Sequence, residues 1–276
     1  MIIYDQPMSD YLASLAIGSS SAKLVLESLR LFKDERDGLI KSGETDATAF
    51  GTAFHAFILQ PDLFQSLLSE GPINEKTCKP YGRDSLKWKE WEAVNPGRIV
   101  LPPDEMETLL LMQERMPREV REIFANPTAK RECSIYQDFN GLAVKCRPDQ
   151  LDSEYINDLK TIDDINNIRR AFRQRKYWFG QAWYKRIVAK ECGERKHRFI
   201  FAEKKAPYRW KIVGENEDRV YQSMIYVDDV IQRLQDAATS GQWIDVDYKL
   251  YQELSWEDCG VYDENEIAQT SDGINL

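Results

Sequence analysis

Residues 147–160 read Arg-Pro-Asp-Gln-Leu-Asp-Ser-Glu-Tyr-Ile-Asn-Asp-Leu-Lys, and we expect the fold to be organised around this stretch. Asp149 precedes a short apolar run that carries Asp158 and Lys160. Successive side chains of a strand point to opposite faces, so Asp158 and Lys160 should face the same way. Two carboxylates and a lysine on adjacent strands can bind a divalent metal ion and hold a water molecule beside it.

An Asn-Gly pair fixes the strand register upstream of this stretch. Asn140 and Gly141 separate two strand-like runs, residues 132–139 and 142–147. A type I′ hairpin turn needs positive φ at both central positions, which Asn and Gly favour. Counting back from this turn places Glu132 opposite Asp149. Like charges directly opposite each other are destabilising, so this pair invites a cation.

A second turn at 153–154 would set Asp149 opposite Asp158. Its turn chemistry is weaker, and a bulge could shift the register. Both turns together bring four residues to one face of a small antiparallel sheet: Glu132, Asp149, Asp158 and Lys160. The alternative is a solvated strand face, because the chain is rich in acids. The two interpretations stay open at this level.

Composition narrows the class of protein. The chain has 276 residues, enough for a sizeable core, and a net charge of −9. This charge argues against a wholly basic nucleic-acid binder, but it is compatible with an enzyme whose basic residues are local. The five cysteines are scattered without a C-x-x-C pair, which argues against a disulfide framework and against zinc or iron–sulfur sites.

The start of the chain has no basic segment followed by an apolar core, and no apolar run approaches the length of a membrane span. We therefore expect a cytoplasmic protein without a membrane partner. We also expect one domain over residues 1–256, mainly helical over 1–130, with the sheet and its flanking helices over 131–256. Residues 257–276 form an acidic tail that we expect to be partly disordered.

Three helices are predicted in the first half of the chain. Serines at 19–21 are N-cap candidates for a helix from Ala22 to about Ile40. Residues 47–60 are nearly all apolar or small and predict a buried helix that stops before Pro61. This helix carries His55, and a lone histidine on an apolar helix is more often a core residue than a ligand. Pro103 begins a third helix, to about residue 126.

A basic segment follows the central stretch, since residues 165–190 contain no acid at all. Interleaved aromatic residues and a possible break at Gly180 accompany the cations. Basic side chains matched to phosphates are the usual electrostatic footprint of DNA binding, and the alternative is a solvated helix face. The candidates for DNA contact are Arg169, Arg170, Arg173, Arg175 and Lys176. Two more strands, 197–202 and 208–213, and a helix from 217 to about 238 are predicted after this segment.

The order of these motifs resembles the RecE-type (exonuclease VIII-like) phage and prophage exonucleases of the PD-(D/E)xK nuclease superfamily. The motifs span roughly residues 45–215 and are Gly51-Thr-Ala-Phe-His55, Glu132, Arg147-Pro-Asp149, Asp158-Leu-Lys160, and Gln181 with Tyr184. The resemblance implies an α/β (α+β) fold with a restriction-endonuclease-like core. This core is a small mixed central sheet flanked by helices, preceded by a helical N-terminal part.

The same resemblance implies a Mg²⁺-dependent 5′→3′ exodeoxyribonuclease. Such enzymes digest double-stranded DNA ends and leave 3′ single strands for phage-type recombination by a single-strand annealing protein (RecT/Bet-like). It also implies two Mg²⁺ ions per site, replaceable by Mn²⁺, and a homo-oligomeric ring such as a tetramer, in a bacterial host.

Residue roles follow from the resemblance alone. Asp149 and Asp158 would bind the metal ions, and the shell would be completed by His55, Glu132 and the backbone carbonyl of Leu159. Lys160 would orient or deprotonate the attacking water and offset developing phosphate charge.

Gln181 and Tyr184 would touch DNA or brace the site. Related sequences usually carry Gln-x-x-x-Tyr, whereas here the spacing is Gln181-Ala-Trp-Tyr184 and Gly180 stands at the expected Gln position. This departure leaves the role of Gln181 open.

Two other classes of function remain open. A Cas4-like nuclease would usually carry a four-cysteine cluster, which this sequence lacks, but a RecB-like nuclease or a structure-specific endonuclease of the same superfamily would fit. The second class is a non-catalytic DNA-binding or phage accessory protein on the same scaffold. The intact set of acids and lysine argues against that second class.

Overall fold

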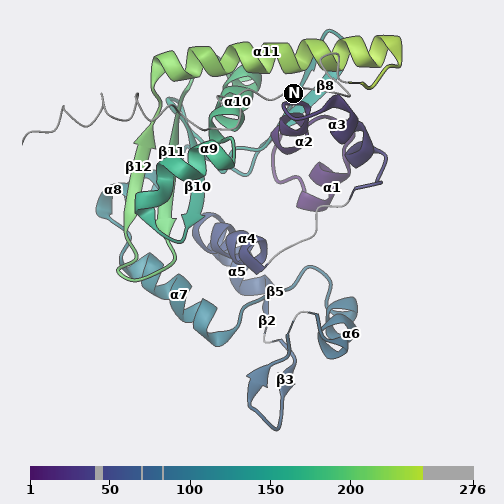
Figure 1. Cartoon of the computed structure of the whole chain (residues 1–276). Helices are drawn as coiled ribbons and strands as arrows, with labels where there is room; N and C mark the ends of the chain where they lie inside the picture. The colour runs from purple at the N-terminus through teal and green to yellow at the C-terminus, as the bar shows by residue number, and fades with distance from the viewer. Residues whose placement is uncertain (41–45, 70, 83, 245–276) are drawn as a thin grey trace, which may run out of the picture. The chain divides into compact units, whose positions relative to one another are not determined.

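A five-stranded mixed sheet carries the fold, with strand order β12-β11-β10-β9-β6 (Figure 1). The computed structural model describes residues 1–40, 46–69, 71–82 and 84–244. Strands β10 and β11 run parallel, and the other pairs are antiparallel. The sheet is therefore mixed, as the predicted fold class requires, and the pairs β6–β9 and β9–β10 next to the predicted acids are antiparallel, as the turns predict. Its strands are β6 (Lys130–Arg131), β9 (Gln150–Leu151), β10 (Tyr155–Ile162), β11 (Lys196–Glu203) and β12 (Trp210–Gly214).

The Asn-Gly turn has the predicted geometry. Asn140 and Gly141 have φ of 51° and 89°, and they join β7 (Ser134–Phe139) to β8 (Leu142–Cys146). The register continues beyond these strands, because the Glu132 N–H donates to the Asp149 carbonyl at 3.1 Å. The prediction that Glu132 lies opposite Asp149 is confirmed.

Glu132 also ends the simple hairpin. Its φ is 49°, a left-handed conformation that is unusual for a residue with a side chain. Upstream of it, β6 pairs with β9 in the five-stranded sheet. Downstream of it, β7 and β8 form a separate sheet with β1 (Ile2–Ile3). One long predicted hairpin is thus divided between two sheets.

The second predicted turn also forms. Leu151 pairs with Ile156, and the Asp152 carboxylate accepts from the backbone N–H groups of Glu154 and Tyr155 at 2.7 and 2.6 Å. This side-chain-to-backbone bonding is the turn-forming habit of Asp. The register points Asp149 toward Asp158, and there the Asp149 side chain accepts from the backbone of Leu159 at 2.6 Å.

Helices precede the sheet, and two of the long helices predicted from sequence are broken. The segment 22–40 divides into α2 and α3, because the Ser28 hydroxyl accepts from the Leu31 N–H and starts a new helix. The segment 103–126 divides into α7 and α8 at Pro117. The helix predicted over residues 47–60 is confirmed, since α4 ends at Leu59, before Pro61. The bounds are α1 (Met8–Ala13), α2 (Ser19–Val25), α3 (Leu29–Arg36), α4 (Asp46–Leu59), α5 (Pro61–Leu67), α6 (Leu86–Val94), α7 (Pro103–Glu114) and α8 (Arg118–Ala125).

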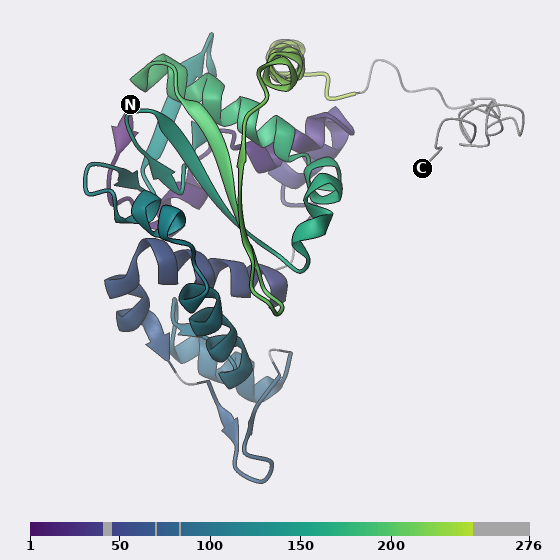
Figure 2. The same cartoon turned by 90° about the vertical axis from the view of Figure 1, so that its left-hand side faces the viewer.

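Four very short strands lie between α5 and α7: β2 (Leu68–Ser69), β3 (Ile73–Asn74), β4 (Lys79–Pro80) and β5 (Ile99–Val100). Strands β3 and β4 form a hairpin that projects away from the five-stranded sheet in both views (Figures 1 and 2).

The basic segment is helical, but its break lies elsewhere than predicted. A short 3₁₀ turn (Ile165–Asn167) leads into α9 (Ile168–Gln174). The chain then turns at Lys176, whose φ is 48°, and continues as α10 (Tyr177–Cys192). Gly180 lies inside α10, so the predicted break there is wrong. The last described helix is α11 (Glu217–Ser240).

Two apolar clusters hold the sheet between helices. One cluster joins Ile156 of β10 to side chains of α2, α10 and α11. The other joins Leu159 of β10 to α4, α7 and α8. Alternation along β10 therefore turns Asp158 and Lys160 toward the first face, as the strand period predicts.

These elements form one compact unit, Met1–Trp243. The end of the expected domain, residues 245–256, and the acidic tail lie outside the described residues. Within the described residues, no helix is both long and apolar enough to cross a membrane.

Candidate functional site

Three potential metal ligands from distant parts of the chain meet at the edge of the sheet. His55, Glu132 and Asp149 each offer one ligand atom, and these atoms lie within 4.8 Å of one another. We call these three residues the metal group. Helix α4 supplies His55, whose Nδ1 lies 3.3 Å from Asp149 Oδ1. His55 is therefore not the satisfied core histidine that its apolar helix suggests.

Glu132, whose backbone is left-handed, is the second member of the metal group. Its Oε2 accepts from Arg147 Nε at 2.8 Å, and Arg147 is itself held by the backbone carbonyl of Gln6 at 2.9 Å. Burial raises the pKa of the Glu132 carboxyl, the charge of Asp149 adds to this, and Arg147 opposes it. Arg147 is thus a positioning residue that sequence analysis quoted in a motif but gave no role.

Asp149 is the best-anchored acid of the site. One oxygen faces His55, and the other accepts from the Leu159 N–H. Burial alone would raise the pKa of Asp149, but the positive charges of His55 and Lys160 outweigh it and hold this pKa well below its usual range. Asp149 is therefore the carboxylate that stays ionised.

Asp158 lies beside the metal group but is not one of the three residues in it. Its Oδ1 accepts from Lys160 Nζ, and its Oδ2 lies 3.9 Å from His197 Nε2. Burial raises the pKa of Asp158 to about 6; Lys160 opposes this shift, and the nearby charge of Asp149 adds to it. A cation near both carboxylates would relieve their repulsion. The Leu159 carbonyl, the other predicted ligand, accepts from Lys160 Nζ at 3.3 Å.

Lys160 lies between the acids of the site and the ring of Tyr177. Its ammonium lies 6.0 Å from the ring centroid of Tyr177. Burial alone would lower the pKa of Lys160, but Asp158 and Asp149 raise it above its ordinary value. Lys160 is thus a cation held next to the acids.

His197 is a site neighbour that sequence analysis missed. It is 1% exposed, and within the described part of the chain both of its ring nitrogens are buried without a hydrogen-bond partner. Burial lowers its pKa to about 3, so it is neutral. In the sequence it is one residue of an ordinary apolar strand, and only the parallel pairing of β10 with β11 brings it toward Asp158.

Gln181 and Tyr184 are both turned inward. Gln181 is 1% exposed, and its side-chain oxygen faces Arg219 at 3.4 Å. The Tyr184 hydroxyl donates to the Arg147 carbonyl at 3.3 Å. Gln181 therefore presents almost no surface to a ligand, and Tyr184 holds the backbone of Arg147.

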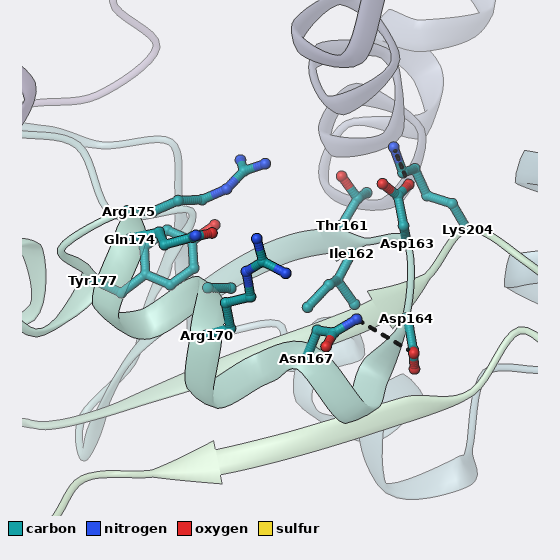
Figure 3. A pocket seen from close by; sticks show the side chains of 11 residues that line it. Thr161, Ile162, Asp163, Asp164, Asn167, Arg170, Gln174, Arg175, Tyr177 and Lys204 are labelled. Carbon is teal, nitrogen blue, oxygen red and sulfur yellow. Dashed lines mark hydrogen bonds and ion pairs between the residues drawn. The ribbon is translucent and has the colours of Figure 1, made fainter. Parts of the chain in front are cut away.

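The predicted basic residues separate into two groups. Arg170 and Arg175 line a pocket of about 230 Å³ together with Tyr177 and Lys204, and we call it the arginine pocket (Figure 3). Its opposite wall carries Asp163, which forms an ion pair with Lys204 at 2.9 Å. Tyr177 lies on the other side, next to Arg175, and its ring also faces the ammonium of Lys160, so the pocket adjoins the lysine of the candidate site.

The other three predicted cations lie outside that pocket. Arg169 and Arg173 are exposed on α9, and Lys176 forms an ion pair with Glu27. Only part of the basic segment therefore faces the site.

The donors of the metal group suit a hard divalent cation. Two carboxylates and one imidazole are compatible with Mg²⁺ or Mn²⁺, and no cysteine is among them. The raised pKa of Glu132 and of Asp158 marks acids that lack enough positive charge in the protein itself. The residues therefore fit a divalent metal.

The chain belongs to the family of PDDEXK-like domains of unknown function (DUF3799), whose model matches residues 18–245. No curated protein matches the sequence. Among solved structures, the fold is similar to a crystal structure described as a putative exonuclease from Eubacterium rectale. The TM-score is 0.62 at 13% sequence identity, over 92% of this chain and 98% of that one. At this identity the likeness shows the fold, which agrees with the family.

Proposed function

We propose that this protein is a metal-dependent deoxyribonuclease that digests double-stranded DNA from its ends. The observation that carries the proposal is the convergence of His55, Glu132 and Asp149 within 4.8 Å, directly beside Asp158 and Lys160. The family and the exonuclease described for the similar fold support the same class of reaction.

The acids would hold the metal. Asp149 and Glu132 each have a carboxylate oxygen near His55, and Asp158 can add an oxygen once its bond to Lys160 loosens. When bound, Mg²⁺ supplies Lewis-acid stabilisation of the phosphate and lowers the pKa of a water molecule.

The protein's own cations would serve the phosphate. Lys160 can orient the attacking water and offset the negative charge that develops on the scissile phosphate. Arg147 holds Glu132 and Tyr184 holds the backbone of Arg147, so both keep the ligand geometry fixed. The guanidinium groups of Arg170 and Arg175 would bind backbone phosphates in the arginine pocket.

The finer parts of the proposal rest on the sequence resemblance. They are 5′→3′ polarity, a 3′ single-stranded product, two Mg²⁺ ions, a ring-shaped homo-oligomer and delivery of the product to a single-strand annealing protein in recombination.

Digestion of a linear duplex labelled separately at its 5′ and 3′ ends tests the proposal. We expect early loss of the 5′ label with Mg²⁺ or Mn²⁺, and none with EDTA or with Asp149→Asn. Glu154→Gln is the matched control, because Glu154 is an exposed acid in the turn between β9 and β10. This control should cleave like the wild type.

Other outcomes separate the alternatives. Early loss of the 3′ label would refute the polarity, and cleavage of a covalently closed circle would indicate an endonuclease. Retention of both labels in both metals, with binding of the duplex intact, would refute catalysis and support a DNA-binding accessory protein.

A further inference from the structure

The side chain of Lys23, on α2, passes over helix α10 at Gly180. A Cβ atom on Gly180 would lie 3.4 Å from Lys23 Nζ and 3.7 Å from its Cε. The two helices pack against each other. The absence of a side chain at Gly180 therefore leaves the space that the Lys23 ammonium uses, and a longer side chain there would displace it.

The backbone that carries Lys23 is fixed. Its neighbours Ala22 and Val25 on α2 are both 0% exposed and belong to the same core cluster as α10. Lys23 itself is half-buried. Its position is thus set by packing and not by a charged partner.

Lys23 differs from the other lysines near it in having no carboxylate partner. Lys160 is paired with Asp158, Lys176 with Glu27 and Lys185 with Glu215. Among the residues that the structure describes, none forms an ion pair with Lys23. A half-buried ammonium of this kind has positive charge available for an anion from outside the protein.

The charges that act on Lys23 are those of Lys160 and Asp158 in the candidate site and, after them, that of Lys176. Burial first, and then the positive charge of Lys160, lower the pKa of Lys23 to about 8, while Asp158 acts in the opposite direction. At neutral pH the side chain is mostly a cation. Lys23 therefore lies within electrostatic reach of the acids and the lysine of β10.

The residue that follows Gly180 on helix α10 is directed away from the surface. Gln181, the next residue, is turned into the core toward Arg219. The surface that α10 turns toward Lys23 is Gly180 itself.

We propose that Lys23 is a substrate-binding residue that reaches the candidate site through the gap at Gly180 and binds a phosphate of the DNA strand. The identity of the strand as DNA rests on the proposed function. The phosphate is either an internal phosphodiester next to the scissile bond or the terminal 5′-phosphate of the strand. The two have the same recognition chemistry, a single anion on an ammonium point charge.

The test is duplex binding by the full chain in EDTA, where cleavage is absent, over a series of salt concentrations. Lys23→Met keeps the length of the side chain and removes its charge. We expect it to weaken binding about fivefold to tenfold and to reduce the slope of log K against log salt by about 0.9, the value for one lost phosphate contact. Lys23→Arg should keep the slope. Lys33→Met is the matched control, because Lys33 on α3 already pairs with Asp37, and it should leave the slope unchanged.

Duplexes with a 5′-phosphate and with a 5′-hydroxyl separate the two sources of phosphate. If Lys23 binds the terminal phosphate, Lys23→Met weakens binding of the phosphorylated duplex alone. If it binds an internal phosphodiester, both duplexes lose affinity equally. A folded Lys23→Met protein with wild-type affinity and slope on both duplexes would overturn the proposal.

Two further measurements keep the proposal falsifiable. Should Lys23→Met fail to fold, Gly180→Gln replaces it, because its side chain displaces the ammonium, and unchanged duplex affinity and slope in that variant would contradict the proposal. Should wild-type protein bind no duplex, the proposed function fails, and thermal unfolding with inorganic phosphate then tests Lys23 separately. A phosphate-induced shift lost in Lys23→Met would support the proposal, and its absence or persistence would refute it.

Discussion

Asp158 on β10 and Glu203 on β11 are carboxylates on adjacent parallel strands, and their surroundings act in opposite directions. Glu203 is 3% exposed and accepts two hydrogen bonds from the Arg209 guanidinium, at 2.7 and 2.8 Å. It also accepts from the backbone N–H groups of Arg209 and Ile165. The bonds from Arg209, above all, lower the pKa of Glu203 to about 2. Burial raises the pKa of Asp158 to about 6.

The difference separates a structural acid from a functional one. Glu203 has its charge fully balanced within the protein and needs nothing further. Asp158 shares one lysine with Asp149, so its negative charge is balanced only when another cation arrives. Buried acids left short of positive charge are a recurrent feature of functional sites.

The largest expected effect is on activity. Asp158→Asn removes the charge that would draw the metal and should lower kcat at least about 10³-fold, which corresponds to about 4 kcal/mol of activation free energy. Glu203→Gln should keep kcat within about threefold, because Glu203 has no role in the proposed chemistry. Single-turnover cleavage of a linear duplex measures both rates. Equal losses in the two variants would erase the distinction between the two acids.

The next largest effect is on stability, and here Glu203 is the acid whose substitution matters. Glu203→Gln loses charge-assisted bonds in a buried place, so the free energy of unfolding should fall by about 2 kcal/mol. Glu122→Gln is the matched control, because Glu122 pairs with Arg118 on the surface of α8. It should cost at most about 0.5 kcal/mol, as exposed pairs do. Denaturant unfolding measures both free energies. A comparable loss in Glu203→Gln and Glu122→Gln would show that burial of Glu203 adds nothing to the strength of its ion pair.

The pH dependence should differ in sign between the two acids. The folded-state pKa of Glu203 lies below its ordinary value of 4.5, so its contribution to stability is present above pH 4.5 and is lost as pH falls toward 2. The folded-state pKa of Asp158 lies above its ordinary value of 3.8, so ionisation of Asp158 destabilises the fold as pH rises from about 4 to 6.

In EDTA, the gap in unfolding free energy between wild type and Glu203→Gln should therefore close from pH 4.5 to pH 2. Asp158→Asn should gain stability relative to wild type between pH 4 and pH 7. Denaturant unfolding of the three proteins across this range provides the measurement, and parallel pH curves would contradict the contrast.

The smallest effect concerns the DNA track next to Asp158. Arg170→Ala should weaken duplex binding about threefold and lower the salt slope by about 0.9, since Arg170 lines the arginine pocket. Arg169→Ala is the control on the same helix, because Arg169 is exposed and does not line this pocket. Fluorescence anisotropy in EDTA measures the slopes. A larger change in the control would place the DNA on another face of α9.

Much of the sheet could be predicted because its register depends on local turn chemistry. Asn140 and Gly141 adopt the positive φ that these two residue types tolerate. The side chain of Asp152 closes the second turn by accepting from the backbone N–H groups of Glu154 and Tyr155. Helix ends were less predictable. Ser28 and Pro117 break helices whose apolar spacing continues across them, and packing of each piece decides whether the break is used.

The sequence by itself determined that Glu132, Asp149 and Asp158 come close together. Two tight turns fix the strand register from Glu132 to Asp158, and hydrogen bonds between residues close in the chain suffice to form these turns.

Only the tertiary structure decided which distant groups join these acids. His55 arrives on α4, and His197 arrives by parallel pairing of β11 with β10. Each of these contacts joins segments whose separation in the chain is large, and the burial of whole helix and strand faces selects them. In the sequence, His55 was indicated only by the resemblance of its motif to a known family, and nothing indicated His197.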